Sequence, residues 1–567
     1  MLVNSNEILR KAEKEGYAIG AYNINNLEWA RYILEACNSD RCPVILAVTP
    51  KSVAYFGGYR VVYSAVKSLI NDLNIKIDDR YLVKNLSFTL NYGDKLAIIG
   101  EEGNGKSTLL KAILGNCEYA NVNGFINFYN NRIGYLEQVI NNKYLDYKVF
   151  DYLFKNLNTY YDNITDFYKY LDSIKLDDTI LDKKIKNLSG GEKVKISLIK
   201  LLINKYDILF LDEPSNDLDL ETLIFLEDFI NNTNKPIIYI SHDETLLTRT
   251  ANMILHLEQT MKKTDCRTTI LKVDYDTYVN LRLKKIEKET SVAKNEKREF
   301  LKKQEKLQRI MDKVAYKQNT VSRKDPFIAK GLKVKMHALK SQEKKLENME
   351  LTKIPDVEES INFFFENVFI PKTKTIIDLD LKELKIQDKV LAKNIKLNII
   401  GPKHICIIGK NGCGKSTLIK LIYNILKDKN DLKVGYMPQN YDDILNNFKT
   451  PIDFLATDYS KDEITKIRMF LGNMHFTKEE MTGSINNLSM GSKAKLFLIK
   501  LVLTNCNVLL LDEPTRNLSP LSNPIIRKVL KEFTGTIISV SHDRKYITSV
   551  IDDLYILTEN GLIKENN

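Results

Sequence analysis

No run of about 18 consecutive apolar residues occurs in this 567-residue sequence, so we expect no membrane-spanning helix. Cysteine is sparse: the seven Cys are scattered and form no CxxC pair, which argues against a structural zinc site and favours a reducing compartment. Histidine is sparser still, with six in the chain and the first at His242. Residues 1–16 lack the apolar core of a signal peptide. These absences predict a cytoplasmic protein without an integral membrane segment.

Positive charge is present but concentrated in one stretch. Residues 280–350 contain 21 Lys and Arg against 10 Asp and Glu, a net +11 that equals the net charge of the whole chain. The remaining residues are therefore balanced in charge. A localised excess favours one element that contacts a polyanion over a generally basic surface.

The same basic stretch has the periodicity of a helical hairpin. Apolar residues recur every seven positions along its first part. The segment Asn319–Pro326 then interrupts the helix, because Pro lacks a backbone N–H, and a second, shorter helical pattern follows. An arm of about 35 residues would reach about 50 Å. The predicted seam residues are Val279, Ile286, Ala293, Phe300, Leu307, Val314, Leu332, Leu339 and Leu346.

A phosphate-binding loop is predicted before this stretch, at residues 100–107. A short apolar strand runs into GEEGNGKS and then into a helical segment, the context that a P-loop requires. Its glycines let backbone amides curl around phosphates, and the helix N-terminus adds positive potential. Lys106 would reach the β- and γ-phosphates, and Ser107 would ligate Mg²⁺. The candidate ATP-binding residues here are Gly100, Gly103, Gly105, Lys106, Ser107 and Thr108.

Two carboxylates at the end of a later strand support this prediction. In the segment Ile208–Glu213 (ILFLDE), four apolar residues precede the two acids. Asp212 suits the Mg²⁺ shell, and Glu213 suits polarising an attacking water. The alternative, an ordinary buried strand ending in a turn, becomes improbable once both motifs are present.

Three further motifs identify a family. LSGGE at Leu188–Glu192 opens a helix, Gln138 follows a strand in YLEQ, and His242 ends a strand in IYISHD. The ordered set resembles an ATP-binding cassette (ABC) domain. The resemblance implies that LSGGE of one cassette closes over the nucleotide held by the other, that Gln138 senses Mg²⁺ and that His242 contacts the γ-phosphate. The residues of the first signature are Ser189, Gly190 and Gly191.

The whole set recurs after the basic stretch, which predicts a second cassette. Its P-loop is GKNGCGKS at residues 409–416, and its signature is LSMGS at residues 488–492. Lys106 with Ser489 would line a first ATP site, and Lys415 with Ser189 a second. The second set of candidates is Gly409, Gly412, Gly414, Lys415, Ser416, Thr417, Gln439, Ser489, Gly491, Asp512, Glu513 and His542, with Ser416 and Asp512 as Mg²⁺ ligands and Glu513 and His542 as catalytic residues.

The two sites are unequal in sequence. The second signature has Met490 and Ser492 where the first has Gly190 and Glu192, and Ser519 replaces Asp219 after the second carboxylate pair. Both catalytic glutamates are present. We therefore predict that both sites hydrolyse ATP and that the first site, which contains Ser489 and Gly491, is the slower.

The beginning of the chain differs from the rest. Strands are predicted at Tyr17–Tyr22 and Pro43–Val48, both buried, with a helix from Leu27 to Cys37 between them. GYAIGAYNINNLEWARYILEA and PVILAVTPKSVAYFGGY resemble the opening of class II fructose-bisphosphate aldolases, which are zinc-dependent (β/α)8 barrels. Two βα units cannot close such a barrel, and the zinc-binding histidines are missing. We interpret the segment as a fused fragment without aldolase activity.

The junction between this fragment and the first cassette is unusual. Cassettes usually begin with a strand and an aromatic that stacks on adenine, but the position before Asp78 is Ile77. One interpretation is that the fusion has removed the first strand of the cassette.

Two cassettes joined by a charged hairpin, without a membrane segment, resemble the ABC-F proteins over residues 74–567. The run SRKDPFIAKGLKVK resembles the linker tip of their antibiotic-resistance and ribosome-protection members. The resemblance implies that the cassettes bind the ribosomal E site with ATP. It also implies that the linker reaches ribosomal RNA, the P-site tRNA and the peptidyl-transferase centre, where the protein protects the ribosome against antibiotics.

The residues at the hairpin turn suit RNA independently of that resemblance. Tyr316 and Phe327 offer stacking faces, and RNA is usually held by phosphate contacts and stacking. The alternative is a solvated coiled-coil spacer. The candidate RNA-binding residues are Lys317, Arg323, Lys324, Lys330, Lys333 and Lys335.

We therefore predict an α/β protein with two P-loop ABC domains joined by an α-helical hairpin and preceded by a β-α-β-α fragment. The predicted segments are 1–73 (fragment), 74–260 (first cassette), 261–355 (hairpin linker) and 356–567 (second cassette). The expected cofactors are ATP and Mg²⁺, and the chain is expected to be a monomer whose cassettes pair with each other.

Three alternatives remain open at this point. The ATPase subunit of a membrane transporter predicts membrane association and needs no basic hairpin. A non-functional chimera predicts weak ATP binding in the first cassette and poor folding near residue 74. An aldolase predicts zinc binding and sugar-phosphate cleavage, and the missing histidines argue against it.

Overall fold

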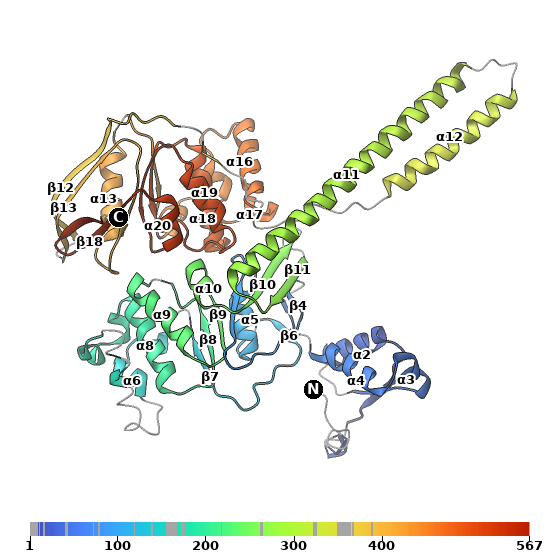
Figure 1. Ribbon diagram of the computed structural model, residues 1–567, viewed down its shortest axis with the longest axis horizontal. Coiled ribbons are helices and arrows are strands. Elements are labelled where there is room, and N and C mark those ends of the chain that lie inside the picture. Colours follow the sequence, from blue (N-terminus) through green and yellow to red (C-terminus); the bar gives the residue numbers. More distant parts are fainter. Residues whose placement is uncertain are drawn as a thin grey trace. The chain divides into compact units, whose positions relative to one another are not determined.

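The computed structural model divides into two compact units, residues 1–275 with 358–567 and residues 276–357 (Figure 1). Each unit is described by itself below. The residues that the structure describes are 9–10, 12–14, 17–39, 44–71, 73–77, 80–117, 119–137, 140–154, 167–169, 171, 176–216, 218–260, 265–320, 326–348, 364–365, 368–386, 389–429 and 431–565.

The first cassette is built on a six-stranded sheet of order β11-β10-β5-β9-β8-β7. Its central strands are mostly apolar, as expected for parallel strands that are buried on both faces. β10 and β11 pair antiparallel, and the other neighbours pair parallel. The strands are β5 (Lys95–Ile99), β7 (Ile133–Leu136), β8 (Ile208–Asp212), β9 (Ile237–Ile240), β10 (Met253–Thr260) and β11 (Asp265–Leu271).

Helices of the first cassette alternate with these strands. Each long helix starts at a side-chain cap or at a glycine, and its apolar residues pack in the core. They are α5 (Lys106–Ile113), α6 (Val149–Phe154), α8 (Gly190–Ile203), α9 (Leu220–Asn232) and α10 (Glu244–Thr250).

The second cassette repeats this architecture. Its sheet has the order β15-β16-β17-β14-β18-β19, which matches the first sheet strand for strand. The strands are β14 (His404–Ile408), β15 (Val434–Met437), β16 (Val508–Asp512), β17 (Thr536–Val540), β18 (Asp553–Thr558) and β19 (Gly561–Glu565). The helices are α13 (Lys415–Leu426), α14 (Asp442–Leu445), α15 (Pro451–Leu455), α16 (Lys461–Asn473), α17 (Lys478–Thr482), α18 (Met490–Leu503), α19 (Asn523–Lys531) and α20 (Arg544–Val550).

An antiparallel sheet accompanies each cassette. In the second it is a hairpin of two 12-residue strands, β12 (Thr375–Ile386) and β13 (Lys389–Ile400). In the first it has three short strands of order β4-β3-β6, where β3 is Leu73–Ile77, β4 is Arg80–Leu86 and β6 is Asn121–Asn123. β3 contributes the buried Leu73 and Ile75 to the core. The interpretation that the fusion removed this strand is therefore wrong: the strand is shorter than its counterpart, and β4 and β6 pair with it on both sides.

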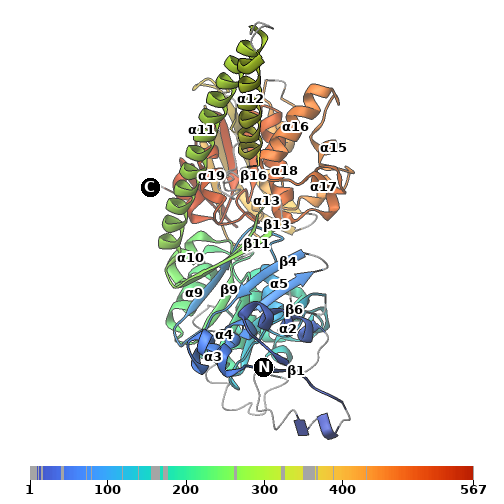
Figure 2. The same cartoon turned by 90° about the vertical axis from the view of Figure 1, so that its right-hand side faces the viewer.

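The hairpin consists of two helices that run side by side in both views (Figures 1 and 2). α11 (Tyr275–Thr320) has 46 residues, about 69 Å, which is longer than the predicted arm. α12 (Pro326–Glu347) starts at a proline, a residue that suits the first helical position. Every predicted seam residue is buried or half-buried, with Ala293, Val314 and Leu339 buried. Leu307 of α11 and Leu346 of α12 line one cavity, so the apolar faces of the two helices meet there.

The N-terminal fragment has the predicted β-α-β-α order. It comprises β1 (Gly20–Asn23), α2 (Leu27–Ser39), β2 (Val44–Ala47), α3 (Pro50–Phe56) and α4 (Tyr59–Asn71), and β1 pairs parallel with β2. The expectation of buried strands is wrong, because β1 is exposed along its length and β2 is half-exposed. A two-stranded sheet has two open edges, and the small core around Ile24, Ala30 and Val62 covers little of it.

The predicted fold class, an α/β protein with two cassettes, a helical hairpin and a small leading segment, is confirmed. Among the described residues, no helix is both long and apolar enough to cross a membrane. The exact limits of the four segments stay a prediction.

Candidate functional site

Each P-loop connects the end of a buried strand to a helix. Gly105 precedes α5 with φ of 88°, and Gly414 precedes α13 with φ of 100°. This left-handed backbone favours glycine. A Cβ at Gly105 would also collide with Leu82 of β4, and one at Gly414 with Leu391 of β13. The glycines therefore place the start of each helix directly under the antiparallel sheet.

The P-loop lysines are buried and fold back onto their own loops. Lys106 Nζ donates to the carbonyls of Gly100 (2.8 Å) and Glu101 (3.0 Å). Lys415 Nζ donates to those of Gly409 (2.7 Å) and Lys410 (2.9 Å). Both amines thus lie at the centre of a loop, where an anionic group held by the loop would reach them.

The strand-end aspartates lie beside the P-loop hydroxyls. Ser107 Oγ donates to Asp212 Oδ1 at 3.0 Å. Burial raises the pKa of both Asp212 and Asp512, and Ser416 hydrogen-bonds to Asp512. Within the described residues, Asp512 Oδ1 is buried without a hydrogen-bond partner. A buried carboxylate oxygen of this kind, next to a hydroxyl, suits a divalent cation such as Mg²⁺.

The two catalytic glutamates occupy equivalent, strained positions. Glu213 follows β8 with φ of 50°, and Glu513 follows β16 with φ of 56°. Non-glycine residues with left-handed backbone cost energy and gather at functional sites. Each glutamate faces the histidine of its own cassette: His242 Nε2 lies 3.2 Å from Glu213 Oε1, and His542 Nε2 lies 4.0 Å from Glu513 Oε1.

The surroundings of Glu213 and Glu513 shift the pKa values of the two carboxyl groups in opposite directions. Burial acts to raise the pKa of Glu213, but His242, Lys106 and a hydrogen bond from Asn216 bring it down to about 2. Burial and the negative charge of Asp512 raise the pKa of Glu513 to about 7. A base with a pKa near the working pH is the more effective one, so Glu513 is the better placed of the two.

The second site is an open cavity between the cassettes. Its volume is about 590 Å³, in the range of small-molecule sites. Ser189 and Gly190 of the first signature line it together with the second P-loop. The predicted residues in its lining are Ser189, Gly190, His242, Gly412, Gly414, Lys415, Ser416, Thr417, Gln439, Asp512, Glu513 and His542.

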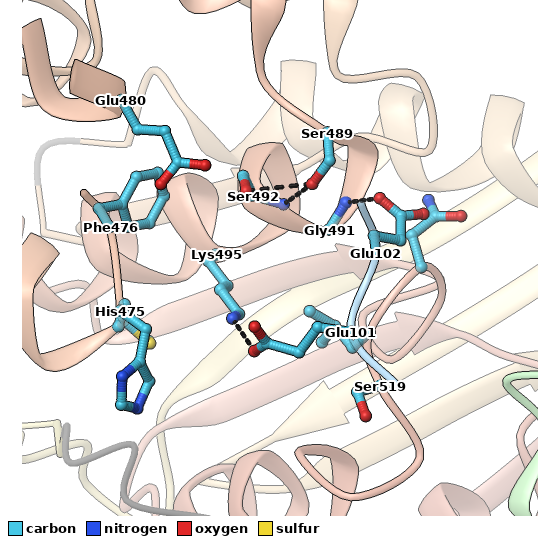
Figure 3. A pocket seen from close by; sticks show the side chains of 13 residues that line it. Glu101, Glu102, His475, Phe476, Glu480, Ser489, Gly491, Ser492, Lys495 and Ser519 are labelled. Carbon is cyan, nitrogen blue, oxygen red and sulfur yellow. Dashed lines mark hydrogen bonds and ion pairs between the residues drawn. The ribbon is translucent and has the colours of Figure 1, made fainter. Parts of the chain in front are cut away.

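The first site is arranged differently where its P-loop meets the second signature. The cavity there has a volume of only about 20 Å³. Ser489 and Gly491 line it with Glu101 and Glu102 of the first P-loop, and Lys106 is not among the lining residues (Figure 3). Gly103, Gly105, Ser107 and Thr108 follow in the loop and in α5. Gln138 lies outside the described residues.

The two signature helices are capped unequally. Ser189 and Glu192 form a reciprocal capping box at the start of α8. In α18 the Ser489 side chain accepts from the Ser492 backbone, but Ser492 has no carboxylate with which to complete the box. This difference follows directly from the Glu-to-Ser change noted in the sequence.

The position expected for an adenine-stacking aromatic is aliphatic in both cassettes. Ile386 ends β12 as Ile77 ends β3, and Ile386 lines the second cavity together with Leu391. Both cassettes therefore carry isoleucine at this position.

The candidate RNA-binding lysines of the hairpin are exposed. Lys317 lies near the end of α11, and Lys330, Lys333 and Lys335 lie on α12. Tyr316 beside them is 72% exposed. Arg323 and Lys324 lie outside the described residues, as does the side chain of Phe327.

Several residues at the sites were not predicted. Glu101, Glu102 and Lys495 join the first P-loop to the second signature helix, and the Leu518 carbonyl accepts from His242 Nδ1 at 2.9 Å across the cassettes. An alignment of the two P-loops could have singled out Glu101 and Glu102, because Lys410 and Asn411 stand at the equivalent positions of the second P-loop.

Among the described residues, no group of three or more His, Cys, Asp or Glu side chains could hold a metal ion by itself.

Comparison with known proteins agrees with this geometry. The ABC transporter family model matches twice, at residues 83–216 and 392–516, and the class II fructose-bisphosphate aldolase model matches residues 3–78. The ATP-binding protein Uup of Buchnera aphidicola is 28% identical over 529 residues, covering 88% of this chain and 81% of its own.

Two further similarities concern proteins named for the ribosome. Ribosome protection protein VmlR of Bacillus subtilis is 27% identical over 527 residues, which cover 88% of each chain. The archaeal ribosome recycling factor aABCE1, solved with the ribosomal stalk protein aP1, superposes with a TM-score of 0.54 at 17% identity, covering 84% of this chain and 87% of that one. The last likeness shows the fold alone. The two cassettes thus match the ABC transporter family model, and the chain is similar along most of its length to proteins of the ABC-F type.

Proposed function

We propose that the protein hydrolyses ATP at two composite sites and uses the closure of its cassettes to engage the ribosome. The observation that carries the ATPase proposal is the second cavity, where Lys415 and Glu513 of one cassette face Ser189 of the other. In this arrangement neither cassette has a complete site alone, so binding of ATP favours the closed pair.

Mg²⁺ would be held by Ser107 and Asp212 in the first site and by Ser416 and Asp512 in the second. The unpartnered Asp512 oxygen and the Ser107–Asp212 contact fit such an ion. When bound, Mg²⁺ would supply positive charge to the phosphates.

The protein's own residues account for the rest of the mechanism. Lys415 lies where it would neutralise the transferred phosphoryl group, and the amides at the start of α8 face it from the other cassette. Glu513 would accept a proton from the attacking water. The His542 backbone holds the Glu513 carboxylate, because the His542 N–H donates to Glu513 Oε2 at 3.3 Å. Glu213 would act likewise in the first site.

The raised pKa of Glu513 predicts that the rate of ATP hydrolysis at the second site depends on pH. In the Glu213→Gln background only the second site has its base, and kcat/KM should rise with pH through about 7, falling about tenfold per unit below it, because the carboxyl must be ionised to accept a proton. In the Glu513→Gln background the residual rate should be flat from pH 5.5 to 8.5, since Glu213 has a pKa of about 2. A flat profile in both variants would contradict the proposed role of Glu513.

The ribosome is proposed as the target because of the hairpin. Residues 280–350 have a net charge of +11, and most of their described lysines are exposed on two long helices, a surface that polyanion binding needs. A relative that covers 88% of this chain is named as a ribosome protection protein. On the basis of this similarity, we propose that the protein protects the ribosome against antibiotics at the peptidyl-transferase centre. The hairpin would contact ribosomal RNA and the P-site tRNA. This would take place in the cytoplasm.

Reversal of charge on the hairpin tests this target. In a Glu213→Gln, Glu513→Gln chain held with ATP, changing Lys330, Lys333 and Lys335 to Glu should lower co-sedimentation with ribosomes at least about tenfold, because each lost phosphate contact weakens binding. The matched control changes Lys284, Lys285 and Lys288, near the start of α11, to Glu, which alters the net charge equally but leaves the tip intact. Equal effects of the two triple variants would mean that the tip contributes only general charge.

A further inference from the structure

Two acidic residues open the first P-loop and reach across to the second signature helix. The Gly491 N–H donates to Glu102 Oε2, and Lys495 Nζ donates to Glu101 Oε1 at 2.5 Å (Figure 3). The Lys495 and Glu101 side chains are only 10% and 19% exposed. The pair is thus a partly buried, charge-assisted contact, which is stronger than a surface ion pair.

The Glu102 carboxylate lies where a nucleotide phosphate would be expected. Gly491 is in the first turn of α18, where the amides have no partner within the helix and, with the helix dipole, favour an anion. In the proposed composite site, these amides receive the γ-phosphate of ATP held by Lys106. The carboxylate and the γ-phosphate are both anions that seek the same donor, so they cannot be bound to it together.

The space around this contact leaves no room for a phosphoryl group. The cavity lined by Glu101, Glu102 and the second signature measures about 20 Å³, which is enough for about one water molecule. A Cβ placed on Gly491 would lie 3.3 Å from Glu102 Oε2 and 2.6 Å from the Asn517 carbonyl. The contact is therefore packed closely on both sides.

The second P-loop has no carboxylate with which to form an equivalent contact. Lys410 and Asn411 stand at the positions of Glu101 and Glu102, and Lys195 stands at the position of Lys495. Two lysines at this distance would repel, whereas Glu101 and Lys495 attract.

We propose that Glu101 and Glu102 form an internal competitor that occupies the γ-phosphate position of the first site in the absence of nucleotide. ATP must displace the Glu102 carboxylate from Gly491 before the first site can close, while ADP, which has no γ-phosphate, has no such competitor. The first site therefore discriminates against ATP and the second does not. This inference rests on the proposed ATPase function.

The test measures ATP and ADP binding to the full chain by equilibrium dialysis with radiolabelled nucleotides and Mg²⁺. A Lys415→Ala change first silences the second site. Adding Glu102→Asn, the residue of the second P-loop, should lower the Kd for ATP about tenfold, equivalent to about 1.4 kcal/mol, and leave the Kd for ADP within about twofold. An unchanged ATP affinity, or an equal gain for both nucleotides, overturns the proposal.

Exchanging the charges of Glu101 and Lys495 controls for substitutions that only damage the P-loop. Glu101→Lys should also tighten ATP binding, because Lys495 would then repel the loop. Adding Lys495→Glu recreates an opposite pair and should return the ATP affinity to that of the parent. Failure of this reversal overturns the proposal. If ATP binds neither to these variants nor to the Lys415 site of the unchanged chain, the proposed ATPase function is wrong. If ATP binds only at the Lys415 site, the ATPase function stands and the proposal of an internal competitor at the first site is wrong.

Discussion

Replacing Glu513 by Gln is expected to lower steady-state ATP hydrolysis at least about 100-fold, whereas Glu213→Gln should lower it less than about threefold. A general base contributes about 10²- to 10⁴-fold to a rate. Glu513 has its pKa near 7 and lies in an open site that the intact first signature completes. Glu213 belongs to the site whose signature has Met490 and Ser492 and whose P-loop carries the Glu102 contact.

Single-turnover hydrolysis by each variant, with enzyme in excess of ATP, measures this difference. The double variant Glu213→Gln, Glu513→Gln gives the background rate. Equal single-turnover rates in the two single variants would contradict the inequality of the sites. A faster residual rate in Glu513→Gln would show that the first site is the main ATPase.

Replacing Arg527 by Ala is expected to cost about 3–5 kcal/mol of stability, because the buried Glu244 carboxylate then keeps only the longer ion pair with Lys545, at 3.5 Å. Arg527 of α19 donates through both Nη atoms to Glu244 of α10, at 2.5 and 3.0 Å, and the two side chains are 10% and 5% exposed. The contact joins the cassettes just beyond His242, and Arg544 with Glu227 repeats the pattern beside it. Thermal unfolding followed by circular dichroism should show a lower first transition.

A double-mutant cycle with Glu244→Gln provides the control for Arg527. Removing both charges should recover much of the loss, since the cost comes from burying the Glu244 charge without its bidentate partner. The exposed pair Lys148 and Asp182 is the comparison, and Lys148→Ala should cost about 0.2–1 kcal/mol or less. A loss at Arg527 as small as that would mean that the buried pair does not hold the cassettes together.

The sequence was sufficient for those parts of the protein in which one residue type has one physical use. P-loop glycines need left-handed backbone, the heptad apolar residues of the hairpin need a seam, and parallel strands buried on both faces need continuous apolar runs. Gly105, Ala293 and β5 are therefore where the patterns predicted them. The repeat strengthened these predictions, because each motif occurred twice in the same order.

Other features depend on contacts between distant segments and could not be predicted in this way. β3 forms from only five residues because β4 and β6 pair with it, which local sequence does not encode. β1 and β2 have the composition of buried strands but lack the neighbours that would bury them. Glu102 was invisible as a functional residue because its partner, Gly491, lies 389 positions away.

Ribosome binding should depend on the bound nucleotide if ATP closes the cassettes onto the ribosome. The Glu213→Gln, Glu513→Gln chain binds ATP in the proposed mechanism but cannot hydrolyse it, so it should be trapped with its cassettes closed. We predict that it co-sediments with ribosomes in ATP and Mg²⁺ and stays in the supernatant in ADP or without nucleotide. A chain that binds ATP yet does not pellet with ribosomes, or that pellets equally without ATP, would contradict the account.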